Sequence, residues 1–356
     1  MPKLTLPSGH AWAFVDANPQ GKTTILCLHG FPDLGYGYRH QIGPWARAGF
    51  RVVVPDMLGY GGSDAPIDPL QYTIKRLAGD LMALLTALGV GRAIVVGHDW
   101  GSFTAGRVAL WHPDRVLALV LMSVPYTPPA RAPMSLNIIA ERAPNLGYQL
   151  FLASPEAAPT LEENIPYFLT LTFSPPSQRT DFTPKGVMKS LLLSLPASIP
   201  SMPCLLKGDA HRAYLSSFRA RGLTGATNYY RTAHLRYVEE SIASLPSTLP
   251  SALPVLSIYG TLDATIAPAA LKAQRRFVPR LREVPLKGAG HWVMIEDVPG
   301  EESPSFVGEG ADPLGGWREQ MSAGAWKGRS GDGGAVGREV LSWLKGLDVA
   351  EVRGKL

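Results

Sequence analysis

A sharp turn predicted around residue 99 has the residue pattern of a catalytic nucleophile. The run Gly97-His98-Asp99-Trp100-Gly101 follows a strand-like apolar stretch and precedes a helix-like one, and its glycines permit a very tight turn. A carboxylate at the centre of such a turn displaces a leaving group from saturated carbon and leaves an alkyl ester on the protein. Asp99 also suits the ordinary role of capping the following helix. The turn alone leaves both interpretations open.

Two residues far along the chain supply the other groups of a hydrolytic site. Asp263 comes just after a predicted strand at residues 254–259, and His291 comes just after the next one at residues 281–286. Each has an ordinary explanation on its own, as a turn residue or a surface histidine. Their order after Asp99, however, is the nucleophile, acid and histidine order of hydrolases with this strand-to-helix turn. Because the carboxyl ends of parallel strands meet at one edge of a sheet, we expect the three to lie together.

A fourth feature is a glycine-proline loop after the predicted strand at residues 25–28. It consists of His29-Gly30-Phe31-Pro32-Asp33, and because Pro32 has no N–H, Phe31 would be the donor in this loop. The backbone N–H groups of Phe31 and Trp100 are therefore the candidate oxyanion hole, which stabilises negative charge on a reacting oxygen. An ordinary turn would explain the glycine and the proline but not their occurrence together with the Asp99 turn.

A sheet must hold these residues, and the sequence predicts one of the α/β class. Short apolar segments alternate with helical patterns along the first third of the chain, which indicates a mostly parallel sheet covered on both faces. The predicted strands are residues 25–28, 51–54, 93–96, 115–124, 254–259 and 281–286, and the predicted helices that flank them are residues 72–88, 102–111 and 339–347.

The chain between residues 126 and 250 interrupts this alternation. Strand-like runs vanish there, prolines multiply and helical fragments appear. We therefore predict an α/β core split between residues 1–125 and 251–356, with residues 126–250 inserted as a helical lid. Residues 300–337 are rich in glycine and lack periodicity, so we expect a surface excursion there.

Composition narrows the classes of function. The chain has 356 residues and a formal net charge of +5 without a basic block, so we expect no nucleic-acid partner. Its cysteines, Cys27 and Cys204, are too few for a disulfide framework, and the first residues lack the apolar core of a signal peptide. Prolines interrupt both long uncharged stretches, so no membrane span is expected. The few cysteines fit a reducing interior, so the expected location is cytoplasmic. The ending Gly354-Lys355-Leu356 weakly resembles a peroxisomal address, which leaves the peroxisome as the alternative.

The sequence resembles the soluble epoxide hydrolase family of α/β-hydrolases over roughly residues 4–299 and the final helix. The Asp99 turn and the glycine-proline loop are shared with other hydrolases. The remaining matches are Tyr38-Arg39-His40-Gln41-Ile42, Asp56-Met57-Leu58-Gly59-Tyr60-Gly61 and Gly290-His291-Trp292.

A pair of lid tyrosines separates that family from its relatives, and two segments match. The run Gly147-Tyr148-Gln149-Leu150-Phe151 resembles the first context. The run Asn228-Tyr229-Tyr230-Arg231 resembles the second, in which the tyrosine directly before the arginine is catalytic. The resemblance thus implies Tyr148 and Tyr230 as donors to the epoxide oxygen, with Tyr229 as a stacking neighbour. The alternative is that both tyrosines only pack the interior of the lid.

The resemblance implies hydrolysis of a small epoxide to a vicinal diol without a metal or cofactor. Asp99 would form a covalent ester, and His291, oriented by Asp263, would activate water. The chain is compatible with a homodimer.

Other functions stay open at this point. A haloalkane or haloacid dehalogenase also uses an aspartate turn, but a halide leaves without protonation and makes paired tyrosines superfluous. A non-catalytic binding protein of this fold usually lacks one member of the triad. A biosynthetic enzyme in which a substrate hydroxyl replaces water would need the same residues.

Overall fold

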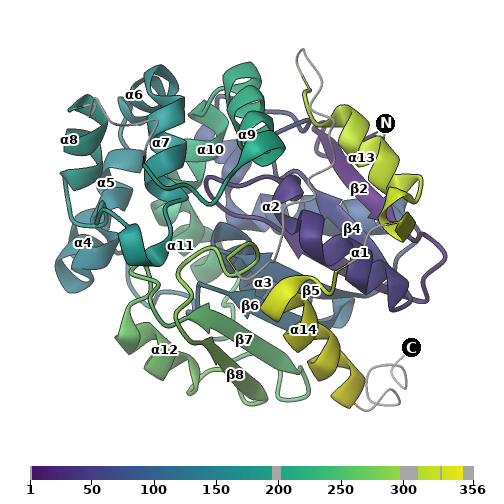
Figure 1. Ribbon diagram of the computed structural model, residues 1–356. Helices are drawn as coiled ribbons and strands as arrows, with labels where there is room; N and C mark the ends of the chain where they lie inside the picture. The colour runs from purple at the N-terminus through teal and green to yellow at the C-terminus, as the bar shows by residue number, and fades with distance from the viewer. Residues whose placement is uncertain (1, 195–201, 297–311, 329–330, 348–356) are drawn as a thin grey trace.

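Eight strands form one sheet in the computed structural model, which describes residues 2–194, 202–296, 312–328 and 331–347 (Figure 1). The strands are β1 (Lys3–Thr5), β2 (Ala11–Ala17), β3 (Thr23–Leu28), β4 (Phe50–Pro55), β5 (Ala93–His98), β6 (Val116–Met122), β7 (Val255–Gly260) and β8 (Leu281–Leu286). Their spatial order is β1-β2-β4-β3-β5-β6-β7-β8. The pairs β1–β2 and β2–β4 are antiparallel, and the pairs from β4 to β8 are parallel.

The central strands are apolar along their whole length because helices cover both faces of the sheet. All six residues of β5 are buried, and so are five of the six residues of β3. The six strands expected from the sequence are all present, with ends within two residues of the predicted ones. The hairpin of β1 and β2 was not predicted. Four successive residues of β2 are buried, so the polar alternation of an exposed antiparallel strand is missing there.

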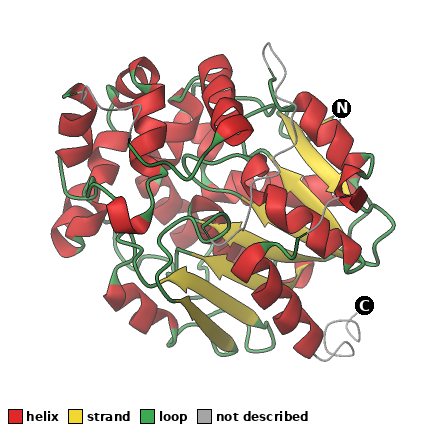
Figure 2. Ribbon diagram, in the orientation of Figure 1, coloured by secondary structure: helices red, strands yellow, loops and turns green. Residues whose placement is uncertain are grey.

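Helices pack on both faces of the sheet (Figure 2). Around the strands lie α1 (Arg39–Arg47), α2 (Ile74–Ala87), α3 (Trp100–Trp111), α12 (Pro268–Gln274), α13 (Gly315–Ser322) and α14 (Gly334–Gly346). Helix α1 contacts β4 and α14, while α3 contacts β5 and β6 and is covered in turn by α2. Among the described residues, no helix has both the length and the apolar character needed to cross a membrane.

The described part of residues 126–250 adds only helices to this core. They are α4 (Leu136–Arg142), α5 (Tyr148–Leu152), α6 (Ala157–Glu163), α7 (Ile165–Thr172), α8 (Val187–Leu193), α9 (Gly208–Arg221), α10 (Thr224–Asn228) and α11 (Ala233–Ile242), joined by short 3-10 turns. In Figure 1 they gather as one teal and green group beside the sheet. We call residues 126–250 the helical insertion.

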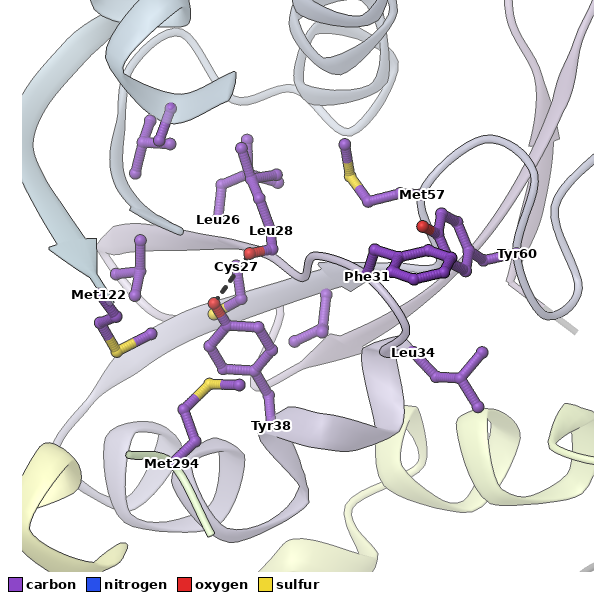
Figure 3. Close-up of a cluster of buried hydrophobic side chains, with 14 of the residues drawn as sticks. Leu26, Cys27, Leu28, Phe31, Leu34, Tyr38, Met57, Tyr60, Met122 and Met294 are labelled. Carbon is purple, nitrogen blue, oxygen red and sulfur yellow. Dashed lines mark hydrogen bonds between the residues drawn. The ribbon is translucent and has the colours of Figure 1, made fainter. Parts of the chain in front are cut away.

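An apolar cluster anchors the carboxyl end of β3, where the chain turns into the glycine-proline loop (Figure 3). The hydroxyl of Tyr38 donates a hydrogen bond of 3.0 Å to the carbonyl of Leu28, and Cys27 is fully buried beside them. This packing fixes the start of the loop that carries Phe31.

The surface excursion predicted for residues 300–337 is wrong for the part that the structure describes. Helix α13 lies in this segment and packs against β2, and its side chains Trp317 and Met321 are fully buried, as is the preceding Leu314. Their spacing of three and four residues is helical, but the surrounding glycines hid it. Residues 297–311, 329–330 and 348–356 lie outside the described residues, and with them the peroxisome-like ending.

A buried cation ties α13 to the core. The side chain of Arg318 is 2% exposed, and its guanidinium bonds Asp56 at 2.5 Å and also Asp312. Asp56 accepts two further hydrogen bonds from the N–H groups of Gly35 and Gly62. Burial alone would lower the pKa of Arg318, but Asp56 and Asp312 raise it above its ordinary value. The ion pair thus joins α13 to the loops after β3 and β4.

Replacing Arg318 by methionine should lower the free energy of unfolding by roughly 3–5 kcal/mol, because Asp56 would stay buried without its counter-charge. The matched control is Arg338→Met, since the pair of Arg338 with Asp332 is about half exposed on both sides and should contribute less than about 1 kcal/mol. Urea denaturation measures both variants, and equal losses would contradict a structural role for the buried pair.

Candidate active site

Asp99 occupies a strained turn between β5 and α3. Its φ of 54° and ψ of −121° lie in a region that side chains rarely adopt. The flanking residues must be glycine: a Cβ on Gly97 would lie 2.2 Å from the carbonyl oxygen of Gly101, and a Cβ on Gly101 would lie 2.0 Å from that of Leu28. The Asp99 side chain makes no capping hydrogen bond to α3. Helix capping therefore does not explain this aspartate.

The Asp99 carboxylate is held by the two predicted backbone donors. The N–H of Phe31 donates to Oδ1 at 2.8 Å, and the nearby N–H of Trp100 helps to lower the pKa of the carboxyl group. Gly30 makes this approach possible, because a Cβ there would lie 2.3 Å from the same Oδ1. Oδ1 of Asp99 is thus fixed by the N–H of Phe31, and Oδ2 faces the imidazole of His291.

A neutral histidine supports the loop that carries Phe31. The N–H of Met57 donates to Nε2 of His29 at 2.9 Å, so Nδ1 carries the proton, and it lies 3.0 Å from the carbonyl oxygen of Gly30. Burial lowers the pKa of His29 to about 4 despite the nearby Asp56. The imidazole therefore acts here as a fixed, uncharged brace.

Asp263 and His291 lie beyond the ends of β7 and β8 and form a direct pair. Nδ1 of His291 lies 2.9 Å from Oδ2 of Asp263, and Nε2 lies 3.7 Å from Oδ2 of Asp99. The second distance is too long for a hydrogen bond. The imidazole is therefore oriented by one carboxylate and faces the free oxygen of the other.

Burial and charge set the protonation of this triad. Burial alone would lower the pKa of His291, but Asp263, Asp99 and Glu296 outweigh it and raise that pKa to about 9. Burial acts the other way on Asp263, yet His291 and Thr265 hold its pKa below the ordinary value. Burial raises the pKa of Asp99, and His291 and the two N–H donors limit the rise. With Asp99 ionised, His291 is accordingly a cation near neutral pH.

Three supporting residues of the triad were not singled out from the sequence. The Thr265 hydroxyl donates to Oδ1 of Asp263 at 2.7 Å and lies 3.1 Å from Nδ1 of His291. Glu296 accepts from the N–H groups on either side of His291, those of Gly290 (2.5 Å) and Trp292 (2.7 Å). His98 donates from Nε2 to the carbonyl of His291 at 2.8 Å.

Weak sequence signals existed for two of these three residues. The Asp-x-Thr spacing of Asp263 and Thr265 is typical of a side-chain turn, and Glu296 ends an otherwise apolar stretch. His98 lies inside the Asp99 turn itself, but its bond to the carbonyl of His291 depends on the tertiary fold.

Both predicted tyrosines face the same pocket as Asp99. Tyr148 begins α5, Tyr230 lies in the 3-10 turn Tyr229–Arg231, and both line the pocket with Phe31, Asp99 and His291. Their ring centroids are 6.4 Å apart. Burial, and then the nearby charge of Asp99, raise the pKa of both phenols well above the ordinary value. Both are therefore neutral hydrogen-bond donors.

The neighbours of Tyr230 leave its proton available. The Trp100 ring lies edge-on to that of Tyr230, 5.2 Å away between centroids. An indole N–H can only donate, so this neighbour takes no proton from the phenol. Tyr229 differs, since its hydroxyl donates to the carbonyl of Leu58 at 2.9 Å, and its ring lies 6.0 Å from that of Trp100.

Arg231 joins the two tyrosine segments. Its guanidinium donates to the carbonyls of Ala153 (3.2 Å) and Ser154 (2.8 Å), directly after the helix that begins at Tyr148. The arginine that follows Tyr230 in the sequence thus fixes one tyrosine relative to the other.

The structure therefore brings the seven predicted site residues together. Five of them line the pocket, and the other two lie directly beside these five. Phe31, Asp99, Tyr148, Tyr230 and His291 line the pocket. Asp263 lies behind His291, and the Trp100 ring lies 5.2 Å from that of Tyr230. Within the described residues, no group of three or more acidic, histidine or cysteine side chains is arranged to hold a metal ion.

Known proteins show the same fold and similar sequences. Residues 23–298 match a family described as the alpha/beta hydrolase fold. Epoxide hydrolase A of Mycobacterium tuberculosis (strain ATCC 25618 / H37Rv) is 33% identical over 315 residues, which cover 86% of this chain and 95% of that protein. Bifunctional epoxide hydrolase 2 of Sus scrofa is 32% identical over 78% of this chain, which spans about half (49%) of that longer protein. The crystal structure of epoxide hydrolase A from Mycobacterium thermoresistibile superposes with a TM-score of 0.72 at 30% identity, and the match covers 83% of this chain and 92% of that one.

The charge balance of the triad makes the titration of His291 a test of the site. His291 should titrate near pH 9 in the wild type, and Asp263→Asn should lower its pKa, because the negative charge that most favours the imidazolium is removed. NMR of labelled histidine rings measures this, with His98 as a buried reference whose pKa burial lowers to about 3. A wild-type midpoint near 6.5, or one that Asp263→Asn does not change, would contradict the geometry.

Proposed function

The chain belongs to the epoxide hydrolases of the α/β-hydrolase fold, and from this membership we propose how its pocket converts an epoxide into a vicinal diol. The family match over residues 23–298 and the 33% identity across nearly the whole of a named epoxide hydrolase carry the assignment. They confirm the fold class and the family resemblance predicted from the sequence. The enzyme hydrolyses small-molecule epoxides.

In the first step, Oδ2 of Asp99 attacks one carbon of the epoxide ring. A bond forms between Oδ2 and that carbon, the ring C–O bond breaks, and its electron pair stays on the epoxide oxygen. Tyr148 and Tyr230 stabilise that oxygen, and one of them delivers a proton to it. The observation that carries this proposal is the pair of buried neutral phenols lining one pocket with a strained carboxylate. An alkoxide is a poor leaving group, so such donors are needed.

In the second step, His291 activates a water molecule against the ester. Ester formation removes the charge of Asp99, one of the contributions that raise the pKa of His291. The imidazolium therefore gives up its proton, which returns to the phenolate left by the first step, and the neutral imidazole becomes a base. Water attacks the carbonyl carbon of Asp99, and negative charge develops on Oδ1. That oxygen already lies against the N–H of Phe31, so the oxyanion hole is in place before the reaction. Collapse of the intermediate breaks the bond between the carbonyl carbon and Oδ2, and the departing oxygen takes the remaining proton of the attacking water. The diol is released, and Asp99 is again a carboxylate beside the His291 imidazolium.

The helical insertion serves this chemistry as a lid that carries both phenols. A buried ion pair docks it on the core: Arg107 of α3 bonds Glu240 of α11 at 2.6 Å, and both side chains are 3% exposed. We propose that this contact fixes the position of Tyr148 and Tyr230 relative to Asp99. The split of the core around residues 126–250 would then serve to place donors opposite the nucleophile.

The dehalogenase alternative fits this pocket less well. A halide leaves without a proton, so that reaction does not need two buried phenols that can act as acids. The binding-protein alternative leaves unexplained why Asp99, Asp263 and His291 are all present and connected.

Removing either phenol should slow ring opening. Tyr148→Phe and Tyr230→Phe should each lower the rate of ester formation from styrene oxide by roughly 100-fold, since each removes a donor to the developing alkoxide. Stopped-flow fluorescence measures ester formation, and chromatography measures the diol.

The matched control is Tyr229→Phe, whose hydroxyl bonds a backbone carbonyl outside the reaction and which should change the rate by a few-fold at most. Equal losses in all three variants would contradict the assignment. Halide release from 1-bromobutane at rates comparable to diol formation would instead favour the dehalogenase.

A further inference from the structure

One charged side chain in the pocket has no part in the reaction described above. Among the described residues that line the pocket, Arg179 is the only lysine or arginine. The pocket also contains the carboxylates of Asp99 and Glu296, but both are already occupied. Asp99 is held by the oxyanion-hole donors, and Glu296 accepts from the two N–H groups that flank His291.

Arg179 lies on a segment that connects the two halves of the reacting site. It follows the 3-10 turn Pro176–Gln178. Pro176 packs against Gly290 beside the catalytic histidine, since a Cβ on Gly290 would lie 3.0 Å from the Cβ of Pro176. Three residues after Arg179, the ring of Phe182 contacts that of Tyr148 at 5.8 Å between centroids. Arg179 is thus placed between the histidine loop and the first phenol.

The guanidinium of Arg179 has donors to spare. Its side chain is 21% exposed, and its ion-pair partner Asp181 lies 3.8 Å away, beyond hydrogen-bond distance. Oδ1 of Asp181 already accepts from the N–H and the hydroxyl of Thr183, at 3.0 and 2.6 Å. A guanidinium carries five N–H donors, and a largely shielded cation normally has them satisfied. A fork of free donors at a pocket wall is the geometry that binds a carboxylate through two parallel hydrogen bonds.

We propose that Arg179 binds a carboxylate of the substrate, so that the enzyme selects epoxides that carry an acid group. This inference rests on the proposed function and specifies the substrate class of the same pocket. A monoanion fits better than a phosphate dianion. The His291 imidazolium is already paired with Asp263 and faces Asp99, so Arg179 is the cation left for the ligand, and a second negative charge on the ligand would be uncompensated. The carboxylate binds at the lid wall while the epoxide ring lies between the tyrosines and Asp99.

The experiment compares each acid with its own methyl ester. The probes are ω-epoxyalkanoic acids of increasing chain length, and the readout is the ratio of kcat/KM for the acid to that for the ester. The wild type should prefer the acid at one chain length. Arg179→Gln should lower this ratio by roughly 10- to 100-fold, as expected for loss of a charge-assisted hydrogen bond, mainly through KM. Arg179→Lys should restore part of the preference, because it keeps the charge but not the planar fork.

Two further variants separate ligand binding from a structural role in the lid. Asp181→Asn removes the nearby carboxylate that competes for Arg179, so the acid preference should rise. If the Arg179–Asp181 contact only braces the lid, Asp181→Asn and Arg179→Gln should lower the activity on acid and ester together, and that result would overturn the inference. Arg142→Gln alters an exposed arginine of α4 that does not line the pocket, and it should leave the ratio unchanged.

Failure of this inference and failure of the proposed function are distinguishable. Equal acid-to-ester ratios in the wild type and Arg179→Gln, in enzymes that both convert the neutral esters to diols, would overturn the carboxylate site and leave the hydrolase intact. Absence of diol from every acid and every ester in the wild type would overturn the proposed function itself, and the carboxylate site with it.

Discussion

The hydrogen bond from the Phe31 N–H to Oδ1 of Asp99 is the constraint on which the site depends. It assigns different roles to two chemically equivalent oxygens, one held in the oxyanion hole and the other directed at the imidazole of His291. Three glycines make it sterically possible, because a Cβ at Gly30, Gly97 or Gly101 would collide with neighbouring atoms. The strained backbone of Asp99 is therefore maintained by close packing on every side of the turn.

In the proposed mechanism, charge balance links the two steps of the reaction. The carboxylates of Asp263, Asp99 and Glu296 raise the pKa of His291, so it is protonated before substrate reacts. Burial, together with the charge of Asp99, raises the pKa of both phenols and keeps them protonated. Once Asp99 becomes a neutral ester, the field at His291 changes in the direction that favours the free base. Ring opening thus prepares the base that the second step needs, and no large movement of these side chains is required.

The sequence was informative where function depends on local pattern. Buried strands are continuous apolar runs, and Asp263 and His291 follow two of them directly, so the sheet and the proximity of these two residues to Asp99 could be predicted. Thr265 contacts Nδ1 of His291 across the fold. Glu296 bonds the nearby N–H groups of Gly290 and Trp292, and the apolar periodicity of the sequence does not reveal this loop. Helix α13 was missed because glycine-rich flanks obscured its apolar positions. Arg179 resembles any surface arginine in the sequence, and only the folded lid places it in the pocket wall.

A single turnover in oxygen-18 water tests most directly whether Oδ2 of Asp99 is the nucleophile. With enzyme in excess over epoxide, the account predicts an unlabelled diol, because the oxygen added to carbon comes from the carboxylate. The heavy oxygen should then appear in the peptide that contains Asp99. A labelled diol from the first turnover, with no label on Asp99, would mean that water attacks the epoxide directly and would contradict the covalent mechanism.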